Sequence, residues 1–346
     1  MTQPMPAPAD SPARANQRLD WARGALVDAT AGLERASTDA GFRSYWRTTG
    51  FEPTRIVMDS PPDKEDVRPW LRMHDVLAGG GVRVPRVLAR DEALGFLLLE
   101  DLGTTTFLHD IHDDNADALF DGAVAQLLKL QAITPPPNLP AYDEAMLARE
   151  LRLFDEWFCG RHLGLALDCD AMEALDGAYR HLIDAALAQP QVLVHRDFMP
   201  RNLMQADDGP AVLDFQDAVS GPIAYDALSL FKDAFLSWPA ERVQGWLRGY
   251  HARALAAGLP VPSLERFLRD ADLIGIQRHL KVIGIFARLN YRDHKPKYLT
   301  DVPRFFDYLD EALPRHPGLA PLARFIDERV KPAMAARVAE QHDAPA

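Results

Sequence analysis

The sequence predicts an α+β fold in which a small, mainly antiparallel sheet with one packed helix precedes a larger, mostly helical part. Short strand-like segments bounded by turn residues are concentrated before about residue 103. Beyond about residue 105, long amphipathic stretches dominate, and only two short strand-like pieces interrupt them. We therefore expect a disordered tail over 1–16, a sheet lobe over 17–103 and a helical lobe over 104–346.

The first elements follow the tail. Residues 1–16 are rich in proline, alanine and polar residues and have no apolar core stretch, which predicts disorder and argues against a signal peptide. The next stretch carries Leu19, Leu26 and Leu33 at roughly helical spacing and predicts one helix. Small and polar residues at 37–43, with aromatic residues beyond them, predict the tip of a β-hairpin.

Three further strands and a helix complete the predicted sheet lobe. "TRIVMD" (54–59) reads as a short strand closed by the turn "SPPD". Residues 64–81 predict a helix that three consecutive glycines stop. Residues 83–103 predict two more strands, the second strongly apolar.

The remainder of the chain is expected to be helical. Seven amphipathic stretches are predicted helices: 115–133, 143–163, 170–188, 224–236, 239–257, 263–290 and 318–340. The strand-like pieces "QVLVH" (191–195) and "AVLDF" (211–215) are expected to form one small strand pair. A cleft between two unlike lobes would be a favoured place for a ligand.

Composition excludes several classes of protein. The net charge of −12 disfavours binding to nucleic acid. No run of about eighteen apolar residues is present, so no membrane span is expected. Two cysteines, Cys159 and Cys169, fit reduced thiols in the cytoplasm better than a disulfide scaffold. No obligate protein partner is evident.

An acid, an amide and a second acid follow the two strand-like pieces. Asp197 comes just after the first piece, Asn202 lies five residues further on, and Asp214 ends the second piece. A carboxylate and an amide oxygen are hard ligands suited to Mg²⁺, and a separate carboxylate can accept a proton from an attacking hydroxyl. These are the minimal parts of a phosphoryl-transfer site.

The motif "HRDFMPRN" resembles the H-x-D-x-x-x-x-N catalytic loop shared by protein kinases and the aminoglycoside phosphotransferase–choline kinase superfamily. "LDF" (213–215) stands where that pattern has its magnesium-binding D-F-G. The resemblance implies a bilobal protein-kinase-like fold, ATP and Mg²⁺ as cofactors, Asp197 as catalytic base, and Asn202 and Asp214 as metal ligands. It also implies that His195 and Asp226 brace the loop. Gln216 in place of the D-F-G glycine points to the small-molecule phosphotransferases.

The resemblance also suggests the nucleotide site. "LLLEDLG" (97–103) resembles the hinge strand of the superfamily, where the backbone of Glu100 and Leu102 would bind the purine edge. The hairpin tip can present backbone N–H groups to phosphates. Its candidate residues are Ser37, Thr38, Gly41, Phe42 and Arg43.

One position departs from the protein-kinase pattern. Met58 stands where a strand lysine would hold the α- and β-phosphates. Arg43 is the nearest candidate replacement, or Mg²⁺ and backbone groups hold the phosphates without it. The gap leaves open a nucleotide-binding regulator without catalysis, although the retention of Asp197, Asn202 and Asp214 argues against that alternative.

A basic stretch within 276–297 is the candidate acceptor wall. If the helix continues, Arg278, Lys281 and Arg288 fall within a sector of about 80°. The stripe is either a solvated face or a wall for an anionic group. Trp157 offers an apolar face for a sugar ring or packs in the core.

Four segments resemble the anomeric N-acetylmuramate/N-acetylglucosamine kinases of bacterial cell-wall recycling. They are "VMDSPPD" (57–63), "EWFCGRHLG" (156–164), "DFQDAVSGPIAYD" (214–226) and "QRHLKVIGIFARL" (277–289). The resemblance implies ATP-dependent phosphorylation of the anomeric hydroxyl of an amino sugar, and in that group a methionine in place of the strand lysine would be normal. A sister kinase acting on an aminoglycoside, choline or an amino acid is the alternative.

Overall fold

The chain is organised as two units in the computed structural model, which describes residues 11–38 and 42–343. The first unit comprises Met1–Ile133 and Pro200–Asp217, and the second comprises Thr134–Met199 and Ala218–Ala346. The chain therefore leaves the second unit after Met199 and returns to it at Ala218. Each unit is considered by itself below.

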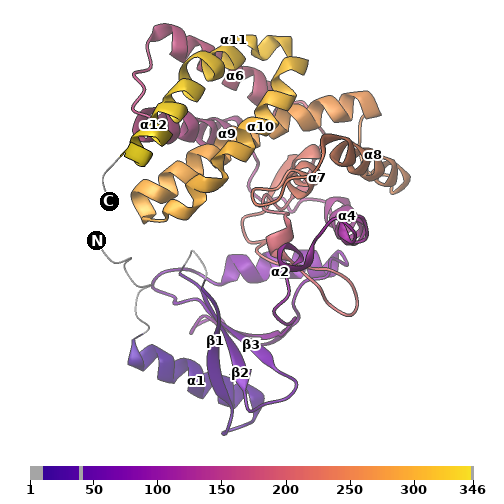
Figure 1. The fold of residues 1–346 in the computed structure, drawn as a ribbon. Coiled ribbons are helices and arrows are strands. Elements are labelled where there is room, and N and C mark those ends of the chain that lie inside the picture. The colour runs from indigo at the N-terminus through magenta and orange to yellow at the C-terminus, as the bar shows by residue number, and fades with distance from the viewer. Residues whose placement is uncertain (1–10, 39–41, 344–346) are drawn as a thin grey trace. The chain divides into compact units, whose positions relative to one another are not determined.

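A five-stranded antiparallel sheet forms the centre of the first unit (Figure 1). Its order is β1-β2-β3-β5-β4, and every neighbouring pair is antiparallel. The strands are β1 (Gly32–Thr38), β2 (Ser44–Thr49), β3 (Arg55–Asp59), β4 (Val87–Asp91) and β5 (Phe96–Glu100). The predicted sheet and all five of its strands are confirmed.

Helix α1 (Pro12–Leu26) precedes the sheet and is shorter than predicted at its C-terminal end. The Ser11 hydroxyl caps it by accepting from the Arg14 amide at 3.2 Å, so the helix begins inside the stretch predicted to be a disordered tail. It ends where Val27 adopts a left-handed conformation (φ 55°). The single helix predicted to extend through Leu33 is wrong, because that residue belongs to strand β1.

Helix α1 packs on one face of the sheet through an apolar cluster built on Ala22, Val57 and Leu98. Buried Asp59 adds a polar tie, since its carboxylate accepts from Arg14 at 2.6 Å and from Arg18 at 2.8 Å. Side chains alternate along a strand, so Met58, next to Val57, faces away from α1.

The remaining elements of the first unit include the segment 200–217. They are α2 (Arg68–Gly79), α3 (Phe107–Asp110), α4 (Ala116–Ala132), the 3₁₀ turn η2 (Pro200–Asn202), β7 (Leu203–Met204) and β8 (Ala211–Val212). The Val212 amide donates to the Arg83 carbonyl at 2.7 Å, and the Phe215 ring lies 5.0 Å from that of Trp70 on α2. These contacts attach the second strand-like piece of the motif to the first unit.

The two strand-like pieces of the motif do not pair with each other, so that prediction is wrong. Strand β6 (Gln191–Val194) pairs with β9 (Val219–Pro222) in the second unit, whereas β7 pairs with β8 in the first. The loop after β6 carries Asp197, and the chain passes into the first unit at Pro200. Sequence alternation alone does not select between partners for such short strands.

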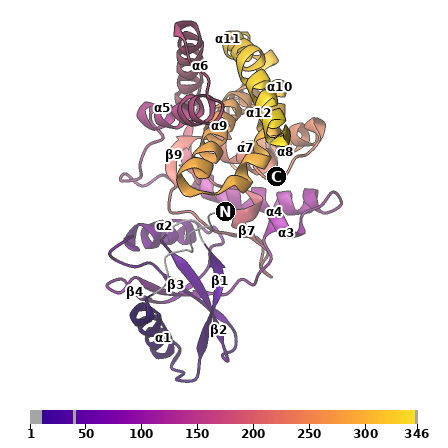
Figure 2. The ribbon, with the colours of Figure 1, turned by 60° about the vertical axis from the view of Figure 1, so that its left-hand side comes forward.

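The second unit is mostly helical, as predicted (Figure 2). Its helices are α5 (Glu144–Leu153), the π-helix η1 (Phe154–His162), α6 (Cys169–Leu187), α7 (Ala224–Phe231), α8 (Ala240–Ala256), α9 (Leu264–Asp293), α10 (Val302–Ala312), α11 (Ala320–Phe325), the π-helical turn η6 (Ile326–Val330) and α12 (Lys331–Asp343), with short 3₁₀ turns η3 (Pro296–Asp301), η4 (Leu313–Arg315) and η5 (Pro317–Leu319). Helix α10 was not predicted. The predicted α+β class is confirmed.

Helix α9 is the central packing element of the second unit, with α5 and α6 alongside it (Figure 2). Gly284 allows α9 to approach the end of α5, because a Cβ at this position would lie 2.3 Å from the Leu153 carbonyl carbon.

Over the described residues, no helix combines the length and apolar character that a membrane span needs.

Candidate functional site

The loop after β6 is anchored by one buried carboxylate of the second unit. Asp226 on α7 accepts backbone N–H groups from His195 at 2.7 Å and from Arg196 at 3.0 Å. The Asp197 amide lies 3.3 Å from the His195 Nδ1 atom, and both His195 and Asp226 are fully buried. Asp226 and His195 thus both contact the backbone of this loop, and the bracing role that the family resemblance implies for them stays a prediction.

Burial has an electrostatic cost at Asp226. Desolvation is the main cause that raises the pKa of its carboxyl to about 6, although His195 and the two backbone N–H groups oppose this rise. Arg196 is the strained residue of the loop, with a left-handed backbone (φ 75°) that non-glycine residues rarely adopt. The loop therefore has a defined conformation that α7 maintains.

The predicted metal ligands lie in the first unit. The Leu213 amide donates to the Asn202 carbonyl at 2.9 Å, which ties the backbones of the two segments together next to Asp214. Asp214 has a left-handed backbone (φ 63°), and its Oδ1 atom accepts from Gln216 Nε2 at 2.8 Å. The Asp214 side chain is 42% exposed, so it remains accessible to a ligand.

The residues present fit a magnesium ion that takes most of its ligands from elsewhere. Within 11–38 and 42–343, no group of three or more His, Cys, Asp or Glu side chains could hold a metal by itself. The candidate protein ligands are one amide oxygen, from Asn202, and one carboxylate, from Asp214. Mg²⁺ commonly binds through one or two carboxylates together with substrate phosphates and water, which matches this sparse set.

The hairpin-tip candidates are described only in part. Ser37 and Thr38 end β1, and Gly41 lies outside the described residues. Phe42 is 58% exposed. Arg43 is buried, with its Nε atom 3.2 Å from Glu65 and its Nη2 atom 4.0 Å from Asp214. Among the predicted tip residues, Arg43 is thus a cation beside the predicted metal ligand.

The hinge candidates occupy the expected strand end. Glu100 ends β5, and its amide donates to the Arg86 carbonyl at 2.9 Å. Its side chain accepts from Arg83 at 2.8 Å. Burial would raise the pKa of Glu100, but this contact and those with Arg86 lower it to about 2. Leu102 follows two residues later, outside the strand. Met58 is fully buried on strand β3, where the protein-kinase pattern has a lysine.

The three predicted basic residues of α9 lie in different surroundings. Arg278 is only 2% exposed, and its charge opposes the rise that burial causes in the pKa of Asp233. Lys281 instead lies 3.0 Å from Glu150 on α5 and interacts electrostatically with Asp197. Arg288 is partly buried and also interacts with the Glu150 charge. The structure thus places Lys281, but not Arg278, in the surroundings of the predicted base.

Trp157 is the predicted sugar-facing residue, and Glu150 is a buried acid of the same unit that the sequence did not single out. Trp157 lies on η1, with the Arg161 guanidinium 5.1 Å from its ring. Glu150 was missed by the sequence reasoning. The signal was present, because Glu150 shares a helix face with the buried apolar residues Leu147 and Phe154. A buried acid on an apolar face usually has a charged partner.

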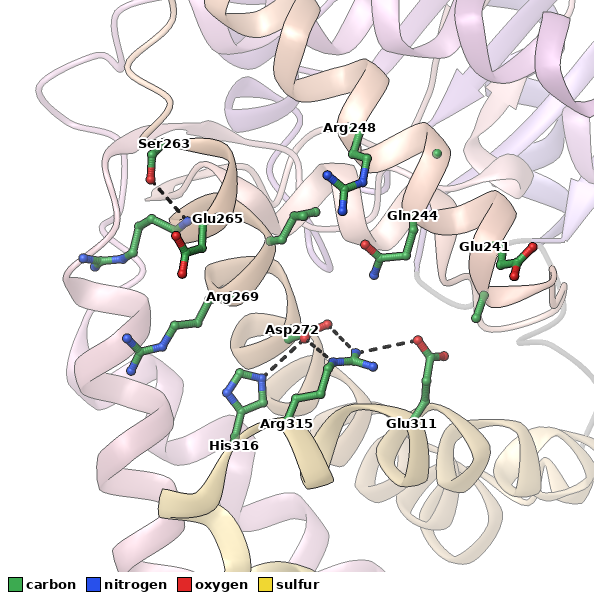
Figure 3. Close-up of a pocket in the computed structure, with 14 residues that line it drawn as sticks. Glu241, Gln244, Arg248, Ser263, Glu265, Arg269, Asp272, Glu311, Arg315 and His316 are labelled. Atoms are coloured by element: carbon green, nitrogen blue, oxygen red, sulfur yellow. Dashed lines mark hydrogen bonds and ion pairs between the residues drawn. The ribbon is translucent and has the colours of Figure 1, made fainter.

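A cavity of about 1060 Å³ lies elsewhere in the second unit, among α8, the start of α9 and the turn after α10 (Figure 3). Its floor holds Asp272, which accepts from Arg315 at 2.8 Å and lies 3.4 Å from His316. Arg248 and Gln244 face the cavity from α8. None of the predicted site residues lines this cavity, so it is separate from the phosphoryl-transfer candidates.

The fold defines the class of protein first. An ADP-bound aminoglycoside phosphotransferase aligns with a TM-score of 0.57 at 14% identity, covering 84% of this chain and 97% of that chain. A choline kinase from Streptococcus pneumoniae aligns with a TM-score of 0.59 at 12% identity, covering 86% and 99%. At such low identity these likenesses establish the fold alone, which is that of protein-kinase-like small-molecule phosphotransferases.

The family follows from sequence. The chain belongs to the phosphotransferase enzyme family, whose model matches residues 32–263. Relatives called N-acetylmuramate/N-acetylglucosamine kinase are 54% identical in Pseudomonas putida, over 86% of this chain and 88% of the relative, and 52% identical in Pseudomonas aeruginosa, over the same shares. A relative of the same name in Neisseria meningitidis is 43% identical, over 90% of this chain and 94% of its own length.

Proposed function

We propose that this chain is an ATP-dependent kinase that phosphorylates the anomeric hydroxyl of N-acetylmuramate, N-acetylglucosamine or both, giving the sugar 1-phosphate and ADP. The observation that carries the proposal is the 54% identity, over 86% of this chain, to a relative named for these two sugars. The presence of Asp197, Asn202 and Asp214 at the catalytic-loop spacing supports activity rather than binding alone.

The proposed reaction is a direct transfer. A lone pair of the anomeric oxygen forms a bond to the γ-phosphorus as the bond between that phosphorus and the β,γ-bridging oxygen breaks. The bridging oxygen leaves with the bonding electrons as part of ADP, and the proton of the anomeric hydroxyl passes to the Asp197 carboxylate. An anomeric hydroxyl is more acidic than an ordinary alcohol, so orientation of this hydroxyl by Asp197 is a large part of its contribution.

Asn202 and Asp214 are the residues that would hold Mg²⁺. When bound, this ion neutralises phosphate charge, which is a main requirement of phosphoryl transfer. Arg43, beside Asp214, adds a cation on the nucleotide side of the first unit. This arrangement suits a chain in which Met58 replaces the strand lysine. Because the donor is ATP, we expect the protein to act in the cytoplasm, where ATP is available to recycle wall sugars.

The acceptor side depends on cations of the second unit. N-acetylmuramate carries a lactyl carboxylate that N-acetylglucosamine lacks, and a cation near the acceptor would favour it. Lys281 and Arg288 are the candidates, since both interact with Glu150. Arg278 is held near buried Asp233 instead, so we expect Arg278→Ala to lower stability more than sugar preference.

An acceptor panel tests the proposal. The purified chain is incubated with ATP, Mg²⁺ and, separately, each amino sugar, choline, an aminoglycoside and a hydroxyl-bearing amino acid, and products are identified by mass spectrometry. We expect a mass gain of one phosphoryl group on an amino sugar. Phosphorylation of another acceptor only would assign a sister activity, and ATP binding without ADP release would support a regulator.

A further inference from the structure

Glu150 is a buried carboxylate that bridges two cations in the second unit. Its Oε1 atom contacts both the Arg196 guanidinium and the Lys281 ammonium, the latter at 3.0 Å. Its Oε2 atom accepts from the Tyr142 hydroxyl and lies 3.4 Å from Gln277 Nε2. Burial alone would raise the pKa of Glu150, but Lys281 and Arg196 outweigh it and lower the pKa, so the carboxylate stays ionised.

The contact with Arg196 holds the catalytic loop from a second side. The Arg196 amide is bound by Asp226 on α7, and its side chain is bound by Glu150 on α5. Its left-handed backbone is sparsely populated by non-glycine residues, so the surroundings have to maintain it. Asp197 is the next residue in the chain. Glu150 therefore contributes to the position of Asp197 without contacting the reacting atoms.

The contact with Lys281 leaves a hydrogen-bond donor available. The ammonium has three N–H groups. Among the described residues it contacts Glu150 at 3.0 Å and the Tyr225 hydroxyl at 3.2 Å, and the ring centroids of Tyr142 and Tyr225 lie 5.9 Å and 5.7 Å from it. These two oxygens leave one N–H without an oxygen acceptor among the described residues, although Lys281 is only 8% exposed. A buried ammonium with an unused donor favours a polar ligand. Asp197 directly follows Arg196, which shares the Glu150 Oε1 atom with this ammonium, and the Asp197 charge also acts on the ammonium.

The charges around Glu150 keep both of its cationic partners available for these contacts. One carboxylate lies between two cations, and the pKa values of both are raised: burial would lower them, but Glu150 and the neighbouring tyrosine Tyr225 outweigh it. Both cations therefore stay charged at neutral pH. The pair carries one positive charge more than Glu150 cancels, and Asp197 is the nearby acid that offsets it.

We propose that Glu150 is a positioning residue for phosphoryl transfer, holding Arg196 and with it the Asp197 loop, while it directs the Lys281 ammonium so that its remaining N–H binds an oxygen of the acceptor. The inference rests on the proposed kinase function but concerns only the second unit. It makes α5 the element that links the base on the β6 loop to a donor on α9.

The test compares two glutamates of the same helix. Glu150→Gln keeps size and removes the charge, whereas Glu144→Gln removes an exposed carboxylate that pairs with Arg180 at 3.1 Å. We expect kcat/KM for the acceptor to fall at least about tenfold in E150Q, as for loss of a well-placed charged hydrogen bond, with KM for ATP within about twofold of wild type. E144Q should match wild type in both.

A pH profile separates positioning from a structural role. Without Glu150, Lys281 faces Arg196 and the tyrosines Tyr142 and Tyr225, with Asp197 as the remaining acid, so its pKa falls. An alkaline loss of activity should then appear in E150Q at a lower pH than in wild type, since burial without a paired acid lowers the pKa of a lysine. The double variant E150Q/K281R should remove this loss, because arginine stays protonated. A profile identical in shape to wild type, or an alkaline loss that K281R does not relieve, would overturn the proposal.

A second pair of variants covers the case in which E150Q does not fold. Lys281→Met keeps the stem and removes the ammonium, and Lys281→Arg keeps the charge. K281M should lose at least about tenfold in acceptor kcat/KM while K281R retains most of it; equal activity of K281M and wild type would reject the inference. All ratios use whichever acceptor the wild-type chain phosphorylates, so failure of the sugar assignment and failure of the Glu150 role give different results.

Discussion

Asp226→Asn separates the anchoring role of this carboxylate from its electrostatic cost. Both Asp226 oxygens accept a backbone N–H, from His195 at 2.7 Å and from Arg196 at 3.0 Å. Asparagine has one acceptor oxygen, so one buried N–H would face an amide NH₂ group. Leaving a buried donor unpaired costs about 1–3 kcal/mol. The catalytic loop should therefore lose one of its two hydrogen bonds to residue 226, and kcat should fall at least about tenfold at pH 7.5.

The stability of wild type and that of Asp226→Asn should depend differently on pH. The folded pKa of Asp226 is raised to about 6 from the ordinary 3.8, so the folded state binds this proton more tightly than the unfolded state. The free energy of unfolding therefore decreases as pH rises from about 4 to about 6, by about 3 kcal/mol in total for this fully buried group. The asparagine side chain introduced by Asp226→Asn does not titrate, so the variant lacks this decrease.

Relative to wild type, Asp226→Asn should be less stable at low pH than at neutral pH. Linkage predicts that the free energy of unfolding of wild type minus that of the variant decreases by about 1.4 kcal/mol from pH 5.0 to pH 7.5. Urea denaturation followed by tryptophan fluorescence measures it, and Asp176→Asn, at an exposed carboxylate of α6, controls for loss of one charge. A stability difference that is the same at both pH values would refute the reasoning that Asp226 is ionised at a desolvation cost.

Three further outcomes are expected. Asp197→Ala should lower kcat at least about a hundredfold with ATP affinity unchanged in calorimetry, and a near wild-type rate would remove it as the base. Asp214→Ala should abolish the magnesium-dependent part of ATP binding in the same calorimeter, and unchanged magnesium dependence would contradict this. Arg288→Ala should raise KM for N-acetylmuramate more than KM for N-acetylglucosamine, and equal effects on both KM values would contradict that. Gly284→Ala should destabilise by about 1–3 kcal/mol in thermal unfolding, because its Cβ would meet the α5 backbone, while Gly249→Ala, with open space around it, should stabilise by up to about 1 kcal/mol.

The sheet and most helices could be predicted because their signals are local. The apolar run of β5 and the glycines after α2 each occur within one short window of sequence. Helix α10 was missed although its signal is also local, because its buried residues Val302, Phe305, Leu309 and Ala312 recur at helical spacing. The limit of α1 depends on a left-handed Val27, which no propensity indicates.

The candidate site was predicted unevenly for a related reason. The spacing of Asp197, Asn202 and Asp214 is a sequence motif and could be recognised directly. The strand partners of the motif are set by tertiary contacts, such as that between Val212 and Arg83. Helical periodicity placed Arg278 and Lys281 on one stripe, but it did not reveal that Arg278 interacts with buried Asp233 whereas Lys281 contacts Glu150.

The central claim is that this chain transfers a phosphoryl group to the anomeric oxygen of an amino sugar, with Asp197 as the base. The most direct measurement uses N-acetylglucosamine labelled with ¹³C at C1, incubated with ATP and Mg²⁺ and followed by ¹³C NMR. Wild type should give a C1 resonance split by ³¹P, and Asp197→Ala should give none in the same time. A product whose C1 resonance is unsplit while phosphate is attached at another carbon, or equal product from the variant, would contradict the account.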